Sequence, residues 1–287
     1  MIKKGIILAG GMGTRVGPVT KSVSKQLLPI ADKPIIFYSL SLLMLINIKN
    51  ILLIIKEEDY GSYFKLLGNG SDFGIKINYE IQKNPKGLPE AFILGKDFID
   101  NQNVALILGD NFFYGQSLID LIQNESKNFK VGATIFTYSV KNPEAYGIVE
   151  RKGKLNNIVE KPRKTNSNEA ITGLYFFDKD ASKISSGLKP SKRNELEIVD
   201  LINTYNKKKK LRISILGRGS AWLDTGTSDD ILKASNYVNI IESRQNLKIA
   251  CIEEIAFKKK WINKKKIVSR ISFYGKSAYS DYLRKLI

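Results

Sequence analysis

The chain has 287 residues, 43% of them hydrophobic, and 46 Lys and Arg against 28 Asp and Glu give it a formal net charge of +18. This length can form one large domain or two small ones, and the single cysteine excludes an internal disulfide. The sequence has no histidine, which excludes Ser–His and Cys–His nucleophiles and histidine-based zinc sites.

Apolar strand-like runs alternate with segments of helical periodicity in the first half of the chain. The apolar runs predict strands at residues 5–8, 51–55, 75–81, 104–108 and 132–138. The periodic segments predict helices at 34–46, 60–67 and 89–98, and Pro34 and Pro89 suit a first helical turn. Continuous apolar strands alternating with helices predict an α/β, Rossmann-like fold whose mostly parallel sheet is covered on both faces.

Shorter strand-like pieces between residues 146 and 177 predict an inserted β region. Residues 228–245 are then predicted to be a helix, because Thr227 and Asp230 have the spacing of a capping box. We expect a single domain over 1–287, with the β insertion at about 140–180 and a C-terminal helical region at about 227–287. The apolar run 35–46 is too short to cross a bilayer and no signal peptide is visible, so we expect a cytoplasmic protein.

The high positive charge raises the hypothesis of a nucleic-acid binder. The lysine runs 207–210, 258–260 and 264–266 stand in turns or near helix ends, without a recognised nucleic-acid-binding motif. We therefore favour a solvated basic surface, which can still attract anionic substrates, over a nucleic-acid or membrane partner.

A glycine-rich loop, LAGGMGTRVGPVTKSVSKQLLPI, follows the first predicted strand. Gly10, Gly11 and Gly13 can present backbone N–H groups to an anion, and Arg15 and Lys25 can neutralise a polyphosphate. The spacing matches neither the dinucleotide-binding fingerprint nor a Walker A loop. A tight strand–helix turn with surface cations is the alternative interpretation of the loop alone.

Two aspartates follow apolar segments at positions where strands end. Asp110 comes after the strand 104–108 in LILGDNFFYG, and Asp224 precedes the helix start in AWLDTGT. Mg²⁺ commonly takes one or two protein carboxylates and keeps several waters, so this pair predicts a magnesium site. Taken singly, each aspartate is as well explained as a turn or a helix cap.

The motifs KGIILAGGMGTR, SKQLLPI, LGDNFFYG, EKP, TGLYFFD, ELEIVDLINTY, GRGSAWLDTGT and ESRQNLKIACIEEIAF, in this order, closely resemble the glucose-1-phosphate thymidylyltransferases. The resemblance to these sugar-nucleotide pyrophosphorylases runs from about residue 3 to about residue 257. It implies transfer of a nucleotidyl group from dTTP to glucose 1-phosphate, with Mg²⁺ as cofactor and release of pyrophosphate. It also implies a homotetramer that serves dTDP-rhamnose and polysaccharide biosynthesis.

The resemblance also implies a role for individual residues. Catalysis would fall to Arg15, Lys25, Asp110 and Asp224, the two aspartates holding the metal. The nucleotide would be bound by Leu8, Gly10, Gly11, Gly13, Thr14, Arg15, Lys25, Gln26, Gln82, Gly87, Asp110 and Asn111, with the two glutamines at the thymine. The sugar phosphate would be bound by Leu88, Tyr146, Gly147, Glu160, Lys161, Ile171 and Arg193. Trp222 is expected to pack in the core.

Two segments depart from the pattern of these enzymes. GTRVGPVT stands where GTRLYPVT is usual, and KGLPEAF stands where DGLAQAF is usual, so that Lys86, Pro89 and Glu90 lie beside the implied pocket. The same chemistry with UTP or another hexose 1-phosphate stays open as an alternative. A catalytically silent homologue is disfavoured, because all four charged catalytic positions are present.

Overall fold

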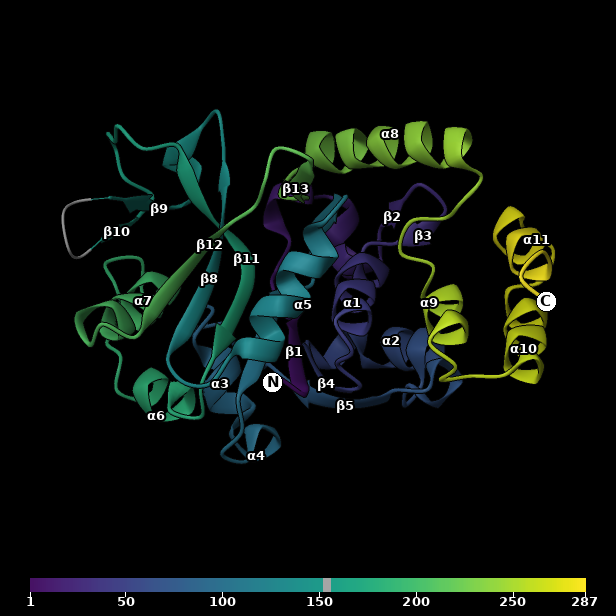
Figure 1. The fold of residues 1–287 in the computed structure, drawn as a ribbon, viewed down its shortest axis with the longest axis horizontal. Coiled ribbons are helices and arrows are strands. Elements are labelled where there is room, and N and C mark those ends of the chain that lie inside the picture. Colours follow the sequence, from purple (N-terminus) through teal and green to yellow (C-terminus); the bar gives the residue numbers. More distant parts are fainter. Residues whose placement is uncertain (152–155) are drawn as a thin grey trace.

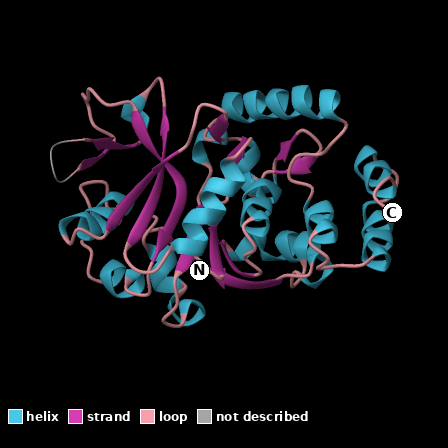
Figure 2. Ribbon diagram, in the orientation of Figure 1, coloured by secondary structure: helices cyan, strands magenta, loops and turns pink. Residues whose placement is uncertain are grey.

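The computed structural model describes residues 1–151 and 156–287. Its strands are β1 (Lys4–Leu8), β2 (Pro29–Ile30), β3 (Lys33–Pro34), β4 (Asn50–Ile55), β5 (Lys76–Ile81), β6 (Val104–Leu108), β7 (Asn111–Gly115), β8 (Ala133–Ser139), β9 (Gly147–Glu150), β10 (Asn157–Glu160), β11 (Glu169–Phe177), β12 (Leu211–Ile215) and β13 (Ser220–Asp224). Its helices are α1 (Ile36–Leu45), α2 (Tyr60–Leu67), α3 (Glu90–Leu94), α4 (Lys96–Ile99), α5 (Leu118–Asn128), α6 (Ala181–Ser186), α7 (Ile198–Lys207), α8 (Ser228–Gln245), α9 (Ile252–Lys258), α10 (Lys264–Tyr274) and α11 (Ala278–Arg284). The predicted α/β fold is confirmed (Figure 2).

The main sheet brings the ends of β1 and β6 together. Within the described residues its strand order is β10-β9-β11-β6-β1-β4-β5, and β8 branches off by pairing with β11 and β12. Strand β1 runs parallel to both β4 and β6, with Leu8 opposite Leu108, so both strands end at the same edge. Because later strands are added on both sides of β1, the loops after β1 and β6 flank a topological switch point, where open α/β sheets bind ligands.

Helices cover both faces of the parallel part of the sheet. Alternate residues of β1 point to opposite faces, so Ile7 packs in the core that contains α1, and Ile6 in the core that contains α3 and α7. Burial of both faces explains why these strands are continuously apolar. Strands β9 and β10 lie at one end of the long axis of the molecule, and α10 and α11 at the other (Figure 1).

Several predicted elements have different boundaries in the structure. The helix expected at 34–46 begins at Ile36, because Pro34 belongs to β3. The helix expected at 89–98 is divided at Gly95 into α3 and α4, in keeping with the low helix propensity of glycine. The helix Ser228–Gln245 is confirmed with its capping box between Thr227 and Asp230.

The lysine runs lie where the sequence suggested. Residues 207–210 form the exposed end of α7 and its turn, Lys258 ends α9 and Lys264 begins α10. Among residues 1–151 and 156–287, helices of the length and apolarity needed to cross a bilayer are absent.

Candidate active site

The glycine-rich loop leaves β1 at the switch point and is held in a fixed shape. Gly13 has a φ of 61°, a left-handed conformation that glycine adopts without steric cost, and its carbonyl accepts a hydrogen bond from Thr20 Oγ1 at 2.9 Å. A short 3-10 helix, Thr14–Val16, follows and places Arg15. A Cβ on Gly10 would lie 2.2 Å from Gln82 Oε1, so this position needs glycine for the close approach of Gln82.

Lys25 and Asp110 form an ion pair at this edge. Lys25 Nζ lies 2.6 Å from Asp110 Oδ2, and the lysine side chain is only 5% exposed. The other carboxylate oxygen, Oδ1, accepts a hydrogen bond from Asn111 Nδ2 at 3.1 Å. Gly11, Gly13, Thr14, Arg15, Lys25, Gln26 and Asp110 line a cavity of about 240 Å³. This small cavity thus combines the glycine loop, two cations and one carboxylate.

Asp224 is brought to Asp110 by a pairing between distant segments. Strand β13 runs antiparallel to β7 with Asp224 opposite Asn111, and Thr225 donates to the carbonyl of Asp110 from its backbone nitrogen and its hydroxyl. Burial raises the pKa of Asp224, and the negative charge of Asp110 raises it further. The fold therefore holds two carboxylates close enough to repel each other, which is a situation that a bound cation relieves.

Asn111 links this edge to the neighbouring strands. Its Oδ1 accepts hydrogen bonds from Trp222 Nε1 at 2.6 Å and from the backbone nitrogen of Gly173 at 3.1 Å. Gly173 lies in a register shift of β11 between Ile171 and Tyr175. Trp222 is buried in the main core, which confirms the expected packing role, and its ring also packs against Tyr146 at 5.2 Å between centroids.

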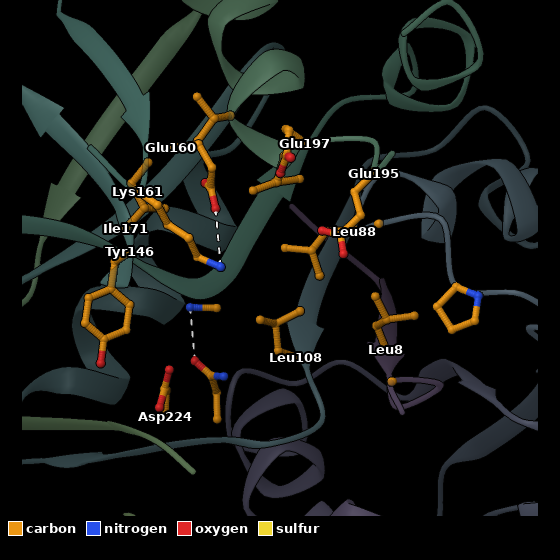
Figure 3. Close-up of a pocket in the computed structure, with 18 of the residues that line it drawn as sticks. Leu8, Leu88, Leu108, Tyr146, Glu160, Lys161, Ile171, Glu195, Glu197 and Asp224 are labelled. Atoms are coloured by element: carbon orange, nitrogen blue, oxygen red, sulfur yellow. Dashed lines mark hydrogen bonds and ion pairs between the residues drawn. The ribbon is translucent and has the colours of Figure 1, made fainter. Parts of the chain in front are cut away.

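A second cavity, of about 610 Å³, extends from the switch point to the inserted β region. Figure 3 shows Leu8 and Leu88 on one side of it and Tyr146, Glu160 and Lys161 on the other. The predicted site residues that line it are Leu8, Gly11, Thr14, Arg15, Gln82, Gly87, Leu88, Asn111, Tyr146, Gly147, Glu160, Lys161, Ile171, Arg193 and Asp224. The structure thus brings together residues that the sequence scatters over more than two hundred positions.

The far end of this cavity contains an ordered group of charges. Arg193 donates two hydrogen bonds to Glu197, from Nε at 3.1 Å and from Nη2 at 2.7 Å, and a third from Nη2 to Glu160 Oε1 at 3.2 Å. The hydrogen bond to Glu197 raises the pKa of Arg193, which is thus held as a cation. Burial raises the pKa of Glu160 despite the neighbouring charges of Lys161 and Arg193.

The two glutamines predicted at the base line different cavities. Gln82 lines the larger cavity, and Gln26 lines the smaller one beside Lys25, where its Oε1 accepts a hydrogen bond from Ser24 Oγ at 3.0 Å. A shared role of the two at one base therefore stays a prediction.

Several lining residues were not predicted from the sequence. The additional residues of the larger cavity are Met12, Pro85, Leu108, Ala145, Thr172, Gly173, Tyr175, Glu195, Leu196, Glu197, Ile198, Val199 and Trp222. Strand periodicity could not have indicated Tyr175, because β11 has a register shift between Ile171 and Tyr175 and the neighbouring residue Thr172 lines the cavity as well. Glu197 could have been indicated by its position four residues after Arg193, a spacing at which the two opposite charges form an ion pair here.

Comparison with known proteins gives a consistent result. The family model for nucleotidyl transferases matches residues 4–239. The glucose-1-phosphate thymidylyltransferase of Neisseria gonorrhoeae is 50% identical over 286 residues, which cover 99% of each chain. That of Mycobacterium tuberculosis strain H37Rv is 44% identical over 288 residues and covers 99% of each chain.

Solved structures share the fold. A crystal structure of a UDP-glucose pyrophosphorylase with UDP-glucose superimposes with a TM-score of 0.72 at 28% identity, covering 85% of this chain and all (100%) of the other. A Bacillus anthracis structure described as a glucose-1-phosphate thymidylyltransferase with sucrose gives a TM-score of 0.75 at 35% identity, covering 82% and 94% of the two chains.

Proposed function

Since the chain belongs to the nucleotidyl transferase family, and within it to the glucose-1-phosphate thymidylyltransferases, we propose that it joins dTTP and glucose 1-phosphate to dTDP-glucose and releases pyrophosphate. The observation that carries this proposal is the convergence of Arg15, Lys25, Asp110 and Asp224 on the carboxyl edge of β1 and β6. The substrates are anions, so a cationic loop at a topological switch point suits them.

The reaction we propose is an in-line displacement at the α-phosphorus of dTTP. A phosphate oxygen of glucose 1-phosphate forms the new P–O bond while the bond between the α-phosphorus and the bridging oxygen of pyrophosphate breaks. This nucleophile is already ionised near neutral pH, so the reaction needs no general base, in keeping with a chain that has no histidine. Catalysis then depends on position and on charge.

Within this scheme, the small cavity receives the triphosphate. The glycine loop supplies backbone N–H donors, Lys25 meets the α-phosphate and Arg15 stabilises the charge of the leaving pyrophosphate. Lys25 already pairs with Asp110, so the phosphate competes for a lysine that the fold holds in place.

Asp110 and Asp224 fit a hard divalent cation. Groups of three or more acidic or cysteine side chains suited to a metal are absent from residues 1–151 and 156–287, so the donors here are a pair of carboxylates. Such a pair suits Mg²⁺, which takes few protein ligands and completes its shell with water and substrate oxygens. When bound, Mg²⁺ supplies polarisation of the α-phosphoryl oxygen.

The inserted β region, at about 140–180, is proposed to bind the sugar phosphate. Tyr146, Gly147, Glu160, Lys161 and Ile171 come from this region, and Leu88 and Arg193 complete that part of the cavity. The carboxylate of Glu160 can accept hydrogen bonds from sugar hydroxyl groups, while Lys161 and Arg193 can meet the phosphate.

The wider setting follows from the resemblance of the sequence. We propose a homotetramer in the cytoplasm that supplies dTDP-glucose for dTDP-rhamnose and polysaccharide biosynthesis. The apolar side chains of Leu232 and Ile240, 59% and 66% exposed on α8, are compatible with contacts between subunits.

Pyrophosphate release by the purified protein tests the proposed reaction. With Mg²⁺ and glucose 1-phosphate, we expect release with dTTP and much weaker release with ATP and GTP. Faster release with UTP than with dTTP would show that the enzyme prefers UTP, and the proposed displacement mechanism would still hold. A folded protein that releases no pyrophosphate with any of the nucleotides, tested with a panel of hexose 1-phosphates, would contradict the proposal.

Glu197→Gln should weaken binding of the sugar phosphate. The substitution replaces the carboxylate that holds Arg193 in two hydrogen bonds. We therefore expect KM for glucose 1-phosphate to rise several-fold, which corresponds to the free energy of about one or two hydrogen bonds, with little change in kcat. Steady-state kinetics at saturating dTTP measures both constants. Glu195→Gln is the matched control, because that carboxylate lies 4.0 Å from Arg193 Nη2 and is 51% exposed. Equal effects of the two variants would contradict the assignment.

A further inference from the structure

A buried carboxylate contacts the side chain of Gln82 and has no role of its own in the proposed reaction. Glu90, in the first turn of α3, is 9% exposed. Its Oε2 accepts a hydrogen bond from Gln82 Nε2 at 2.7 Å and another from the backbone nitrogen of Lys86 at 2.8 Å. Glu90 and Lys86 belong to the KGLPEAF segment, one of the two departures from the usual pattern.

This contact fixes the orientation of the Gln82 side-chain amide. A carboxylate only accepts hydrogen bonds, so the amide nitrogen of Gln82 must face Glu90. The amide oxygen then lies on the opposite side, over Gly10, where a Cβ would approach it to 2.2 Å. The backbone of Gln82 is also fixed, because its nitrogen donates to the carbonyl of Ile55 at 2.8 Å. The side chain is 3% exposed and lines the larger cavity, on the side where Figure 3 shows Leu8 and Leu88.

A fixed amide presents a fixed order of acceptor and donor to a nucleobase. Thymine and uracil carry a hydrogen on ring atom N3, whereas N3 of cytosine is an acceptor beside an amino group. An amide oxygen directed at N3 accepts a hydrogen bond from thymine but opposes the lone pair of cytosine. An amide that is free to turn around could serve either base.

We propose that Glu90 is a positioning residue that fixes the Gln82 amide and so selects a base with an N3–H donor over cytosine. The inference rests on the proposed function, because it takes Gln82 to lie at the base. Methionine at position 90 would remove the constraint, since its thioether is only a weak acceptor for the Gln82 amide, whereas a glutamine oxygen could still accept from both Gln82 and Lys86.

The test compares dTTP with 5-methyl-dCTP, which differ only at the edge of the base that Gln82 would read. Dissociation constants for both are measured by calorimetry for the wild-type protein and for Glu90→Met. We expect the wild-type preference for dTTP to fall at least about fivefold in the variant, the worth of roughly one hydrogen bond. Loss of negative charge near a triphosphate affects both ligands equally and cancels in this ratio. Glu80→Gln removes the same charge two residues from Gln82 and should leave the ratio unchanged.

Each outcome bears on the proposal. An unchanged ratio in Glu90→Met, or a wild-type protein that binds 5-methyl-dCTP as tightly as dTTP, overturns it. If Glu90→Met melts early, the double variant Pro89→Ala/Glu90→Met provides the same comparison with the alanine that is usual at position 89. Binding does not depend on turnover, so a protein that prefers dTTP but releases no pyrophosphate would contradict the proposed function and leave the role of Glu90 standing.

Discussion

Asp224→Asn is expected to lower pyrophosphate release at least about a hundredfold while leaving the melting temperature unchanged or raising it. Burial and the charge of Asp110 raise the pKa of Asp224, so the fold disfavours its ionised form. Asparagine has nearly the same shape and no charge, and it relieves this repulsion. The same change removes one of the two carboxylates proposed to hold Mg²⁺.

The sign of the pH dependence follows from the raised pKa of Asp224. Ionisation of this group in the folded state costs more than in the unfolded state, so its contribution lowers stability as pH rises from 3.8 through the raised pKa and stays unfavourable above it. The stability gain of Asp224→Asn should therefore appear near neutral pH and vanish in acid.

Thermal melting with and without Mg²⁺ gives a second test of the proposed role of Asp224 in binding the metal. Mg²⁺ should stabilise the wild-type protein by binding the folded state and should stabilise Asp224→Asn less. Asp229→Asn, at an exposed position in the first turn of α8, is the control and should keep its activity. A variant that loses stability but keeps its rate would contradict the metal assignment.

Local patterns in the sequence predicted the elements that depend on neighbouring residues. The strand Val104–Leu108 and the helices Tyr60–Leu67 and Ser228–Gln245 were predicted with the observed bounds. Continuous apolar residues in a strand follow from burial on both faces, and a capping box from hydrogen bonds within one turn. The strand β7 was not predicted, because its partner β13 lies about a hundred residues away and the pairing itself stabilises it.

The residues of the candidate site also differ in how far the sequence predicts them. The glycine loop and Asp110 stand out because each follows an apolar strand, and parallel neighbours end at one edge. Glu90 contacts the side chain of Gln82 across the turn between β5 and α3, so its position carries a signal only once the fold is known. Side-chain contacts across elements are the part that one sequence does not predict.

Arg15→Ala should produce a large loss of kcat with little change in stability. Arg15 is an exposed residue that lines both cavities, and its charge favours the ionised form of Asp224. If it stabilises the leaving pyrophosphate, its contribution is greatest in the transition state, when the bridging oxygen gains negative charge. We therefore expect kcat to fall on the order of a hundredfold or more, with a smaller effect on KM for dTTP.

Two further variants separate this role from general electrostatic attraction. Arg15→Lys keeps the charge but loses the planar pair of donors, so it should recover only part of the rate. Arg218→Ala removes an equal charge from an exposed position in the turn between β12 and β13 and should change kcat less than twofold at ordinary ionic strength. If Arg15→Ala instead raised KM at constant kcat, the guanidinium would bind dTTP equally in the ground and transition states, and its assignment to the leaving group would be wrong.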